Sequence, residues 1–536
     1  MKKKLFQTVL LSAMLAIGFI GHAQSPTVGL LFHNPKASEG YTLFSPDFSH
    51  SVYLVDNCGE KINEWIFSEP PALTCYLLDN GTLLRAGSDS LEIRDWDNNL
   101  LWSYPTTANG IRQHHDIHPL PNGNILCLVR DIYLKAEIIA AGRDPSNLLP
   151  KFWLDKLIEI SPVGTHEAHI VWEWKFFDHL IQDFDSTKLN YGVVKDHPEL
   201  LDLNFQNNYP QDYTHVNAVC FNAALDQIII TSRHLSELYI IDHSTTTLEA
   251  AGHSGGNSGM GGDFLWRWGN PQVYREGRAH DQKTFQPHDA KWVEPGYLDE
   301  GKISVFNNGG DGTGTFSSVH LITPSFENGA YRKENNVFAP LDFEWTWSGS
   351  ILGEVVFEEN KSGAHSMPNG NFIITQTSLG QISEVTKNWE HLWTYKSPVG
   401  WNRVYTQYSH IYESDNAFFR GEKYPETYPG FIGLDLTPKG LIEDQNSLSD
   451  SCRTVTGIIK SDVEVISIEN PVENNNIRFN QPIRFNAMTI TDINGRELFR
   501  HGFFHGNNLE VDLKPALYIL RLYFDDRVET RKILVR

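Results

Sequence analysis

The sequence predicts an all-β protein, a six-bladed β-propeller followed by a small C-terminal β-sandwich. Asn-Gly turns separate β-branched apolar runs, most cleanly within Ser362 to Tyr395. Such turns favour hairpins, because both central residues adopt positive φ. Units of four short strands recur at about 40 to 50 residues, which is typical of propeller blades. Aromatic residues make up 12% of the chain, which suits sheets that pack face to face.

The first 23 residues have the pattern of a cleaved secretory signal. Three lysines precede an apolar run from Val9 to Ile20, and small residues end at Ala23. The run is too short for a stable transmembrane helix, and no other stretch approaches one. We therefore expect an exported protein that crosses the periplasm and then stays at the cell surface or is secreted.

Charge and cysteine content limit the partners and the covalent links. The formal net charge of -22 argues against nucleic acid and anionic membranes as partners, because both require a basic surface. The five cysteines are an odd number, so at least one is unpaired or intermolecular. Cys58 and Cys75 are expected on adjacent strands, where they either pair or stay as buried free thiols.

The propeller is expected to span residues 24–445. Its first unit lacks an inner strand and its last unit lacks an outer one, so the two ends are expected to complete one blade and remove exposed sheet edges. An insertion at 132–153 is expected to hold a short helix. Seven blades are the alternative to six. Six outer strands are predicted from their tryptophans: Trp65; Trp102; Trp172 and Trp174; Trp266 and Trp268; Trp345 and Trp347; Trp393.

A polar linker at 446–464 and a β-sandwich at 465–536 are expected to follow. The tail carries Asn470-Pro471, a turn from Asp492 to Arg496 and a strand from Leu513 to Leu520. In this order, the motifs resemble the type A sorting domain of the type IX secretion system. The resemblance implies contact with that secretion machinery, with the tail then removed or used as an anchor. A carbohydrate-binding or adhesive sandwich is the alternative.

Histidines recur at equivalent places on the predicted inner strands. His115, His215 and His288 align when the units are superposed on their turns, and the unit from Ser362 to Tyr395 has Ser362 there, with His365 three residues further on. Equivalent places on a radially symmetric scaffold converge in space, so these histidines are candidate site residues. A single histidine is more often a structural residue, and the chain has 22 of them.

Other kinds of site have weaker signals. His114, Asp116 and His118 share one face of a strand and suggest a metal, but no His-Glu-x-x-His or cysteine partner supports one. The glycine-rich run from Gly252 to Gly262 lacks the strand and helix of a phosphate loop and is expected to be a rim loop. No Gly-x-Ser-x-Gly motif is present. We expect no metal and no cofactor.

Several motifs together resemble the bacterial arylsulfate sulfotransferase family over residues 40 to about 440. They are HHDIHPLPNGNIL, DYTHVNAV with IIITSRHLSELYIID, GGDFLWRWGNPQVY, FQPHDAKW with ISVFNNG, AHSMPNGNFIIT and YPGFIGLDLTPKG. The resemblance implies a six-bladed propeller that transfers a sulfuryl group from a phenolic sulfate donor to a phenolic acceptor without a nucleotide donor. It also implies a histidine nucleophile, a sulfo-histidine intermediate and ping-pong kinetics.

Roles follow from this resemblance and the order of the motifs. His365 is expected to be the nucleophile, with His288 as the second candidate. His215 and His288 are expected to donate to sulfate oxygens and to move protons, and Asn217 and His115 to bind substrate. The family's arginine is expected near Thr313, which is not an arginine, so Arg233, Arg420 or Arg267 is expected to replace it.

Two other functions stay open at this point. A non-catalytic propeller that binds a ligand or a surface is supported by the missing arginine. An aryl sulfate hydrolase requires only that water replaces the phenolic acceptor. The oligomeric state is open between a monomer and a homodimer.

Overall fold

The computed structural model describes residues 26–205, 208–443, 472, 476–492, 496–524 and 528–535. The expected signal segment at 1–23, the linker at 446–464, Cys452 and the Asn470-Pro471 pair lie outside the described residues. So does the middle of the turn from Asp492 to Arg496.

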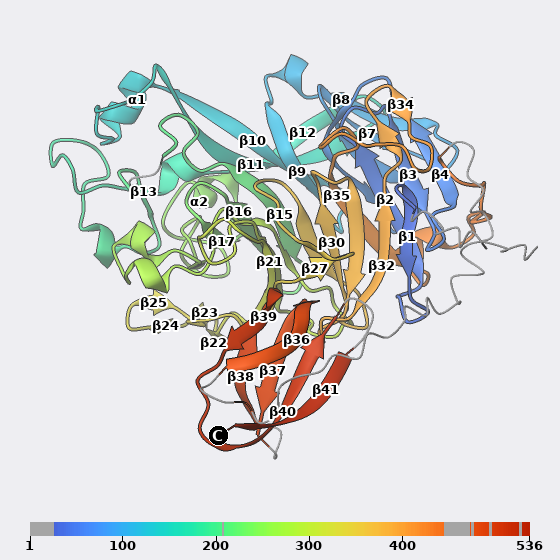
Figure 1. The fold of residues 1–536 in the computed structure, drawn as a ribbon. Coiled ribbons are helices and arrows are strands. Elements are labelled where there is room, and N and C mark those ends of the chain that lie inside the picture. The colour runs from blue at the N-terminus through green and yellow to red at the C-terminus, as the bar shows by residue number, and fades with distance from the viewer. Residues whose placement is uncertain are drawn as a thin grey trace, which may run out of the picture.

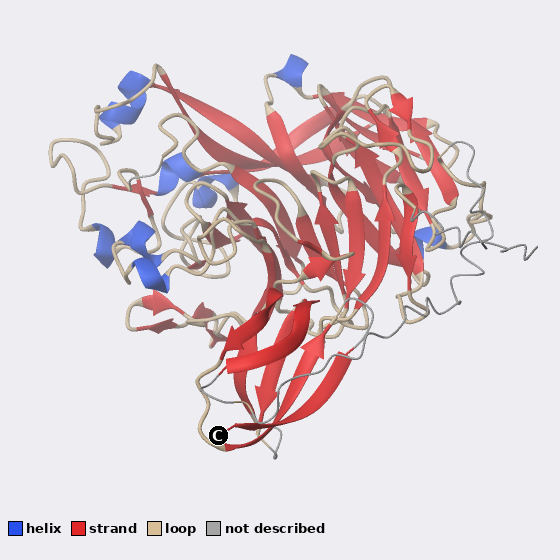
Figure 2. Ribbon diagram, in the orientation of Figure 1, coloured by secondary structure: helices blue, strands red, loops and turns tan. Residues whose placement is uncertain are grey.

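Strands dominate the described chain, and helices are confined to short pieces (Figure 2). The all-β prediction is confirmed. The expected helix in the 132–153 insertion is α1. None of the helices in the described part is long and apolar enough to cross a membrane. The helical segments are α1 (Lys135–Ala140), α2 (Thr247–Ala250), η1 (Thr107–Asn109), η2 (Phe176–His179), η3 (Val194–Asp196), η4 (Pro271–Tyr274), η5 (Ala279–Asp281) and η6 (Pro429–Phe431).

Six antiparallel sheets make up the body of the chain between residues 29 and 425. In sheet order they are β5 (Pro71–Leu77), β6 (Leu83–Gly87), β7 (Ser90–Arg94), β8 (Leu100–Pro105); β9 (Gln113–Pro119), β10 (Ile125–Leu134), β11 (Lys151–Val163), β12 (Glu167–Lys175); β15 (Val216–Asn222), β16 (Gln227–Ser232), β17 (Glu237–Asp242), β18 (Trp266–Trp268); β19 (His288–Trp292), β20 (Ile303–Asn307), β21 (Ser318–Ile322), β26 (Trp345–Trp347); β29 (Gly363–Ser366), β30 (Phe372–Gln376), β31 (Gln381–Val385), β32 (His391–Lys396), with β1 (Gly29–His33) beside β32; and β35 (Phe418–Pro425), β2 (Gly40–Pro46), β3 (Ser51–Val55), β4 (Lys61–Ile66).

The last of these sheets joins the two ends of the body. Strand β35 pairs antiparallel with β2, with Gly40 opposite Pro425 and Phe44 opposite Gly421. Figure 1 shows the orange β35 beside the blue β2 and β3. The prediction that C-terminal and N-terminal strands complete one sheet is confirmed, and β2 is thereby paired along both of its edges.

The predicted tryptophans all lie on the last strand of a four-strand meander, namely β4, β8, β12, β18, β26 and β32. One indole N–H in each sheet donates a hydrogen bond of 2.7–3.0 Å to a backbone carbonyl in a strand, turn or connection of the next sheet. The bond from β32 is to the turn between β3 and β4, near the N-terminal end of the body. These bonds run from Trp65 to Asp95, Trp102 to Glu167, Trp174 to Gly262, Trp266 to Ala339, Trp345 to Lys387 and Trp393 to Asn57.

The sheets bury their apolar side chains against one another on both faces. Every residue of β6, β16 and β20 is buried, so both faces of these strands are covered. Short paired strands lie in the connections: β13 (Leu180–Ile181) with β14 (Leu201–Asp202), β22 (Phe326–Glu327) with β23 (Ala330–Tyr331), β24 (Lys333–Glu334) with β25 (Val337–Phe338), β27 (Ser350–Ile351) with β28 (Glu354–Val355), and β33 (Val399–Gly400) with β34 (Arg403–Val404).

The C-terminal part is a separate pair of sheets with its own core. One sheet contains β36 (Asn476–Phe485) and β39 (Phe504–Glu510), and the other contains β38 (Glu497–His501), β37 (Ala487–Thr491), β40 (Ala516–Tyr523) and β41 (Val528–Val535). Both sheets contribute to one apolar cluster. Ala487 and Tyr523 also pack against the cluster of Trp347 and Trp389 in the body, so the two parts touch (Figure 1).

The expected pairing of Cys58 with Cys75 is wrong. Cys75 is a buried free thiol in β5, and Cys58 is disulfide-bonded. The two residues belong to different sheets, because Cys58 lies in the turn between β3 and β4. Burial raises the pKa of the Cys75 thiol to about 12, so this cysteine acts as a small apolar side chain.

Candidate functional site

Three of the predicted histidines lie where inner strands begin. His115 is in β9, His215 immediately precedes β15, and His288 is the first residue of β19. His115 and His215 have left-handed backbone, with φ of 54° and 44°, as does Ser362 with φ of 72°. In the β19 sheet the left-handed residue is Asp289, so the backbone there is offset by one residue from the expected alignment of His288 with His115. Such conformations are uncommon for residues with a Cβ and are frequent at functional sites.

A cluster of imidazole rings, which we call the histidine cluster, lies at and beside these strand starts. Its members are His114, His115, His215, His234 and His288. The rings of His115 and His215 lie 4.9 Å apart, and those of His215 and His234 lie 4.3 Å apart. His114 and His115 share a hydrogen bond of 2.8 Å between their Nδ1 atoms. Several inner strands therefore bring their histidines to one place, as the repeat predicts.

Burial and mutual repulsion favour the neutral form of two of these rings, His115 and His288. Burial lowers the pKa of His115 well below its usual value, and His114, His215 and His288 lower it further. Burial also lowers the pKa of His288 well below its usual value, with smaller contributions from Arg233, Arg420 and His215. A neutral imidazole keeps the nitrogen lone pair that nucleophilic or base catalysis requires.

His288 has a defined tautomer. Its Nδ1 lies 2.7 Å from Oδ1 of Asn308, whose amide nitrogen donates to the carbonyls of Glu358 and Lys361 at 2.9 and 3.0 Å. Because the amide nitrogen is the donor, Oδ1 must accept, and the His288 proton is on Nδ1. The lone pair is therefore on Nε2, which accepts a long hydrogen bond of 3.2 Å from the Lys361 backbone N–H.

His215 is oriented by a carboxylate. Its Nδ1 lies 2.7 Å from Oδ2 of Asp212, three residues earlier in the chain, and its side chain is 22% exposed. A carboxylate in this place holds the proton on Nδ1 and points Nε2 outward, which is the arrangement of a general base. The same loop fixes His234, whose Nδ1 lies 2.6 Å from the Asp212 carbonyl oxygen.

Arg233 supplies positive charge beside the histidine cluster. Its guanidinium bonds to Oε1 of Gln286 at 2.7 Å and contacts Nε2 of His234 at 3.1 Å. Within the described residues it makes no ion pair with a carboxylate, and its Nε has no hydrogen-bond partner. A guanidinium that has an unused donor and no carboxylate partner is suited to bind the oxygens of an anion.

Arg420 is different, because its charge is already neutralised. Its Nη1 lies 2.9 Å from Asp116 and 3.0 Å from Asp289, and its Nη2 donates to the Asn217 carbonyl at 2.8 Å. These buried ion pairs tie β35 to the inner strands β9, β15 and β19. Arg420 therefore supports the floor below the histidine cluster, where Tyr76 also donates to Asp116 at 2.8 Å.

His365 lies with this floor and, among the residues that the structure describes, makes no hydrogen bond or ring contact with the histidine cluster. Its Nε2 accepts from the Lys423 backbone N–H at 3.2 Å, and its Nδ1 lies 3.6 Å from Oε2 of Glu422. Burial lowers the pKa of His365 to about 4, partly opposed by Glu422. The neighbouring charges are those of the Glu422 and Lys291 ion pair, so a negative carboxylate rather than a free cation faces this ring.

The structure thus unites five predicted site residues and separates two. His115, His215, His288, Arg233 and Asn217 lie together, with the Asn217 amide donating to the Pro287 carbonyl at 2.9 Å. The residues that the prediction missed are the supports Asp212, Asn308 and His234, and His114 was considered only as part of a metal set. Asp212 and His234 are each within three residues of a predicted one, which is the only signal that the sequence offered.

The third arginine candidate, and the position where the family's arginine is expected, are elsewhere. Arg267 is fully buried in β18, where it pairs with Glu237. Thr313 lies in an exposed turn and bonds to Asp311. Arg233 is therefore the arginine beside the histidine cluster.

Two groups in the described chain could offer three ligands to a metal ion. One is Asp212, His215 and His234, but the Arg233 guanidinium lies 3.1 Å from Nε2 of His234 and opposes a second cation there. The other is His179, His253 and Asp263. The suggested set of His114, Asp116 and His118 does not meet at one point, because His114 faces Asp155 and Asp116 faces Arg420.

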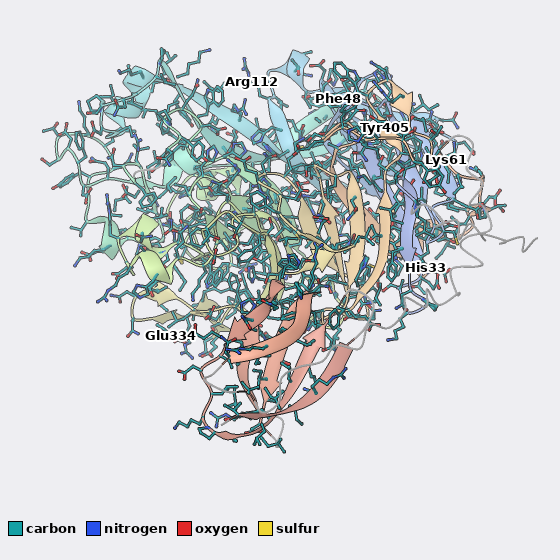
Figure 3. All side chains as sticks on the ribbon, viewed as in Figure 1. His33, Phe48, Lys61, Arg112, Glu334 and Tyr405 are labelled. Carbon is teal, nitrogen blue, oxygen red and sulfur yellow. The ribbon has the colours of Figure 1, made fainter. Side chains whose placement is uncertain are left out.

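A cavity of about 380 Å³ lies outside the histidine cluster. It opens between β10, β11 and the segment before β9, and Arg112, one of its lining residues, is labelled in Figure 3. Its other basic lining residues are Arg130, Lys151 and Lys156. None of the site residues predicted from the sequence lines this cavity, so it is not the reaction centre.

Comparison with known proteins adds a family. The sequence model described as Arylsulfotransferase (ASST) matches residues 33–317. No curated protein matches the chain. A Bacteroides caccae protein of unknown function has a TM-score of 0.38 at 11% identity, covering 73% of this chain and 100% of its own. The β-propeller domain of Cps50 (Swd1) from Myceliophteria thermophila has a TM-score of 0.35 at 10% identity, covering 70% and 90%. Virginiamycin B lyase from Staphylococcus aureus has a TM-score of 0.31 at 10% identity, covering 68% and 87%.

Proposed function

The chain belongs to the arylsulfotransferase family, and from this premise we propose that it transfers a sulfuryl group from a phenolic sulfate ester to a phenolic acceptor. The observation that carries the proposal is Arg233, a cation that no described carboxylate neutralises and whose Nε is an unused donor, beside the neutral imidazole rings of His115 and His288. Sulfuryl transfer requires these two features, a donor set for the sulfate oxygens and a nitrogen nucleophile. The missing arginine was the reason for considering a non-catalytic propeller, and Arg233 is proposed to take the place of that arginine.

We propose His288 as the nucleophile in preference to His365. The Asn308 side chain fixes its proton on Nδ1, and the unneutralised Arg233 lowers its pKa and attracts an anion. One short segment covers both partners: Lys361 N–H bonds to Nε2 of His288, and the Glu359 carbonyl accepts from Arg233 at 3.4 Å. A shift of residues 359–361 would therefore free Nε2 of His288 and the guanidinium of Arg233 together. His365 instead faces Glu422, which repels an anion.

The reaction is proposed to proceed in two balanced steps. The Nε2 lone pair of His288 attacks sulfur, the bond from sulfur to the donor's phenolic oxygen breaks, and that oxygen takes the Nε2 proton of His215, which enters this step as imidazolium and leaves it neutral. The acceptor phenol then gives its proton to neutral His215 and attacks sulfur, and the bond from sulfur to Nε2 breaks. Each step returns the enzyme to the state that the other requires, so ping-pong kinetics are expected without a nucleotide donor or a metal.

Arg233 and His115 are proposed to hold the sulfuryl oxygens during both steps. Their contribution is electrostatic, because the charge distribution of sulfuryl transfer resembles that of phosphoryl transfer. Asn217 and Asn308 are positioning residues, which act through Pro287 and His288. Asp212 acts through His215 in the same way.

The architecture and the location are part of the proposal. We propose that the six sheets are the blades of one closed propeller over residues 24–445, supported by the β35 and β2 pairing and the six indole bonds. Residues 1–23 are proposed to be a cleaved signal and residues 465–536 a sorting domain for type IX secretion. Export is tested by fractionating a bacterium that has this secretion system: the full chain should reach the surface or medium, and a chain ending at residue 464 should stay in the periplasm.

The activity is tested with purified protein, 4-nitrophenyl sulfate and phenol. Transfer predicts release of 4-nitrophenol that depends on phenol, together with formation of phenyl sulfate and parallel double-reciprocal plots. Release of 4-nitrophenol with inorganic sulfate as the only sulfate product would instead identify a hydrolase. The absence of both products would contradict the proposed substrate class.

A further inference from the structure

A second group of side chains converges far from the inner strands. His179 ends η2, which follows β12, while His253 and Asp263 lie at the two ends of the glycine-rich loop before β18. One ligand atom from each residue lies within 4.8 Å of the others. The sulfuryl-transfer mechanism uses none of these residues.

Of the three residues, His179 has the contacts that are hardest to explain without a bound ligand. It is fully buried, and both of its ring nitrogens face oxygen atoms: Nε2 lies 2.8 Å from the Ala250 carbonyl, and Nδ1 lies 2.8 Å from Oδ1 of Asp263. A neutral imidazole carries one N–H, and a carbonyl can only accept, so that proton is on Nε2. The Nδ1 atom then faces a carboxylate oxygen, a contact that requires either a second ring proton or a metal ion bound by both atoms.

His253 repeats this arrangement from another side. Its Nδ1 lies 2.8 Å from the same Asp263 Oδ1 atom, and its ring is nearly perpendicular to that of His179, at 87°. Two ring nitrogens and one carboxylate oxygen thus face a common point from different directions. A divalent ion there would replace two imidazolium protons and would give every lone pair a partner.

The surroundings hold the His179 ring in place as they do for metal-binding histidines. The ring donates to a backbone carbonyl, which is the usual second contact of a ligating imidazole. Trp174 stacks on it at 5.6 Å between ring centroids, and its indole donates to the Gly262 carbonyl at 2.7 Å. A Cβ at Gly262 would lie 2.6 Å from Nε2 of His179, so the loop approaches the ring as closely as only glycine allows.

We propose that His179, His253 and Asp263 bind one divalent transition-metal ion, with Zn²⁺ as the best match. Two imidazole nitrogens and one carboxylate oxygen suit Zn²⁺, and the fourth position would face solvent beside His253, which is 61% exposed. His179 follows the outer strand of one sheet and Asp263 precedes the outer strand of the next. The ion therefore fastens the glycine-rich loop and cross-links two neighbouring sheets.

The test uses the intact protein after dialysis against EDTA. Added Zn²⁺ is measured by calorimetry and elemental analysis, and Co²⁺ by its visible absorption spectrum. His253→Ala is the informative variant, because an exposed side chain is removed without disturbing the core. His280→Ala is the matched control, since His280 is 71% exposed and lies beside Asp281.

The wild-type protein and His280→Ala should bind roughly one ion per chain with a rise in Tm, and His253→Ala should bind at least about tenfold more weakly. Failure of the wild-type protein to bind either ion would overturn the proposal. Equal affinity in His253→Ala would also overturn it.

Discussion

At the scale of single residues, Arg233 has the clearest consequence for activity. It is the arginine of the histidine cluster that no described carboxylate neutralises, whereas Arg420 is held by Asp116 and Asp289. Replacing Arg233 with methionine should lower kcat/KM for 4-nitrophenyl sulfate by about 10² to 10³, as expected for the loss of an oxyanion donor. The measurement is steady-state release of 4-nitrophenol.

Arg332→Met is the control for that variant, because Arg332 is 52% exposed and pairs only with surface carboxylates. It should keep wild-type kinetics. An Arg233→Met enzyme with unchanged kcat/KM would show that sulfate is bound elsewhere.

Asp212 should act through His215 and not on the sulfate itself. The Asp212→Asn variant removes the carboxylate that orients Nδ1 of His215, so kcat should fall by about 10² or more, the range typical of general acid and base contributions. The loss should be smaller for donors with good leaving groups, since these need less protonation. A series of substituted phenyl sulfates measures this dependence, and an equal loss for every donor would contradict the assigned role.

His320 offers a test of how buried histidines make stability depend on pH. Burial lowers its pKa from 6.5 to about 3, while its ring contacts the hydroxyls of Ser318 and Thr346. The unfolded chain therefore binds more protons than the folded one below about pH 6.5, and the free energy of unfolding falls as pH falls from 6.5 toward 3. Tm measured across this range should fall less steeply in His320→Gln than in the wild-type protein, and identical slopes would contradict the account.

At the scale of elements, the outer-strand tryptophans connect one sheet to the next. The Trp393 indole, fully buried in β32, donates to the Asn57 carbonyl at 2.8 Å and so links the sheets that contain the two ends of the body. Trp393→Phe keeps an aromatic ring and leaves that carbonyl without its donor. It should reduce the free energy of unfolding by about 1–3 kcal/mol, seen as a lower Tm.

Trp401→Phe is the matched control, because Trp401 is 59% exposed. Its Tm should equal that of the wild-type protein. Equal Tm values in both variants would mean that the hydrogen bond of the Trp393 indole does not contribute to the free energy of unfolding.

At the scale of the whole molecule, the fold was easier to predict from the sequence than the site. Tryptophans and Asn-Gly turns recur with the blade, so the all-β class, the outer strands and the pairing of β35 with β2 could all be predicted from local patterns. The repeat pattern does not indicate at which position along an inner strand a side chain reaches the histidine cluster. His365 is only three residues beyond Ser362, yet this places it beside Glu422 and outside the histidine cluster.

Contacts made by loops were also beyond prediction. Asp212 and Asn308 lie outside the regular strands, and no periodicity indicates which ring each one orients. The same limit applies to His179, His253 and Asp263, which lie up to 84 residues apart in the chain. For Cys58 and Cys75 the prediction failed for a different reason. The two residues are close in sequence, which suggested adjacent strands, but the chain changes sheet between them.

The proposed closure of the body into a ring predicts how the chain tolerates truncation. A chain ending at residue 464 keeps all six sheets and should retain its activity and most of its thermal stability. A chain ending at residue 417 lacks β35, which leaves β2 as an open edge and removes Arg420, so it should be insoluble or aggregate. Expression and size-exclusion chromatography of both chains decide this, and a soluble monomeric chain ending at 417 would contradict ring closure.

The central claim is that His288 carries the sulfuryl group between donor and acceptor. The most direct measurement is to mix the enzyme with 4-nitrophenyl sulfate without acceptor, quench it in alkali, digest it and locate the sulfonate by mass spectrometry. The account predicts sulfonate on the peptide that contains His288, and none in His288→Ala. Sulfonate on the His365 peptide, or a His288→Ala enzyme that still transfers at the wild-type rate, would contradict it.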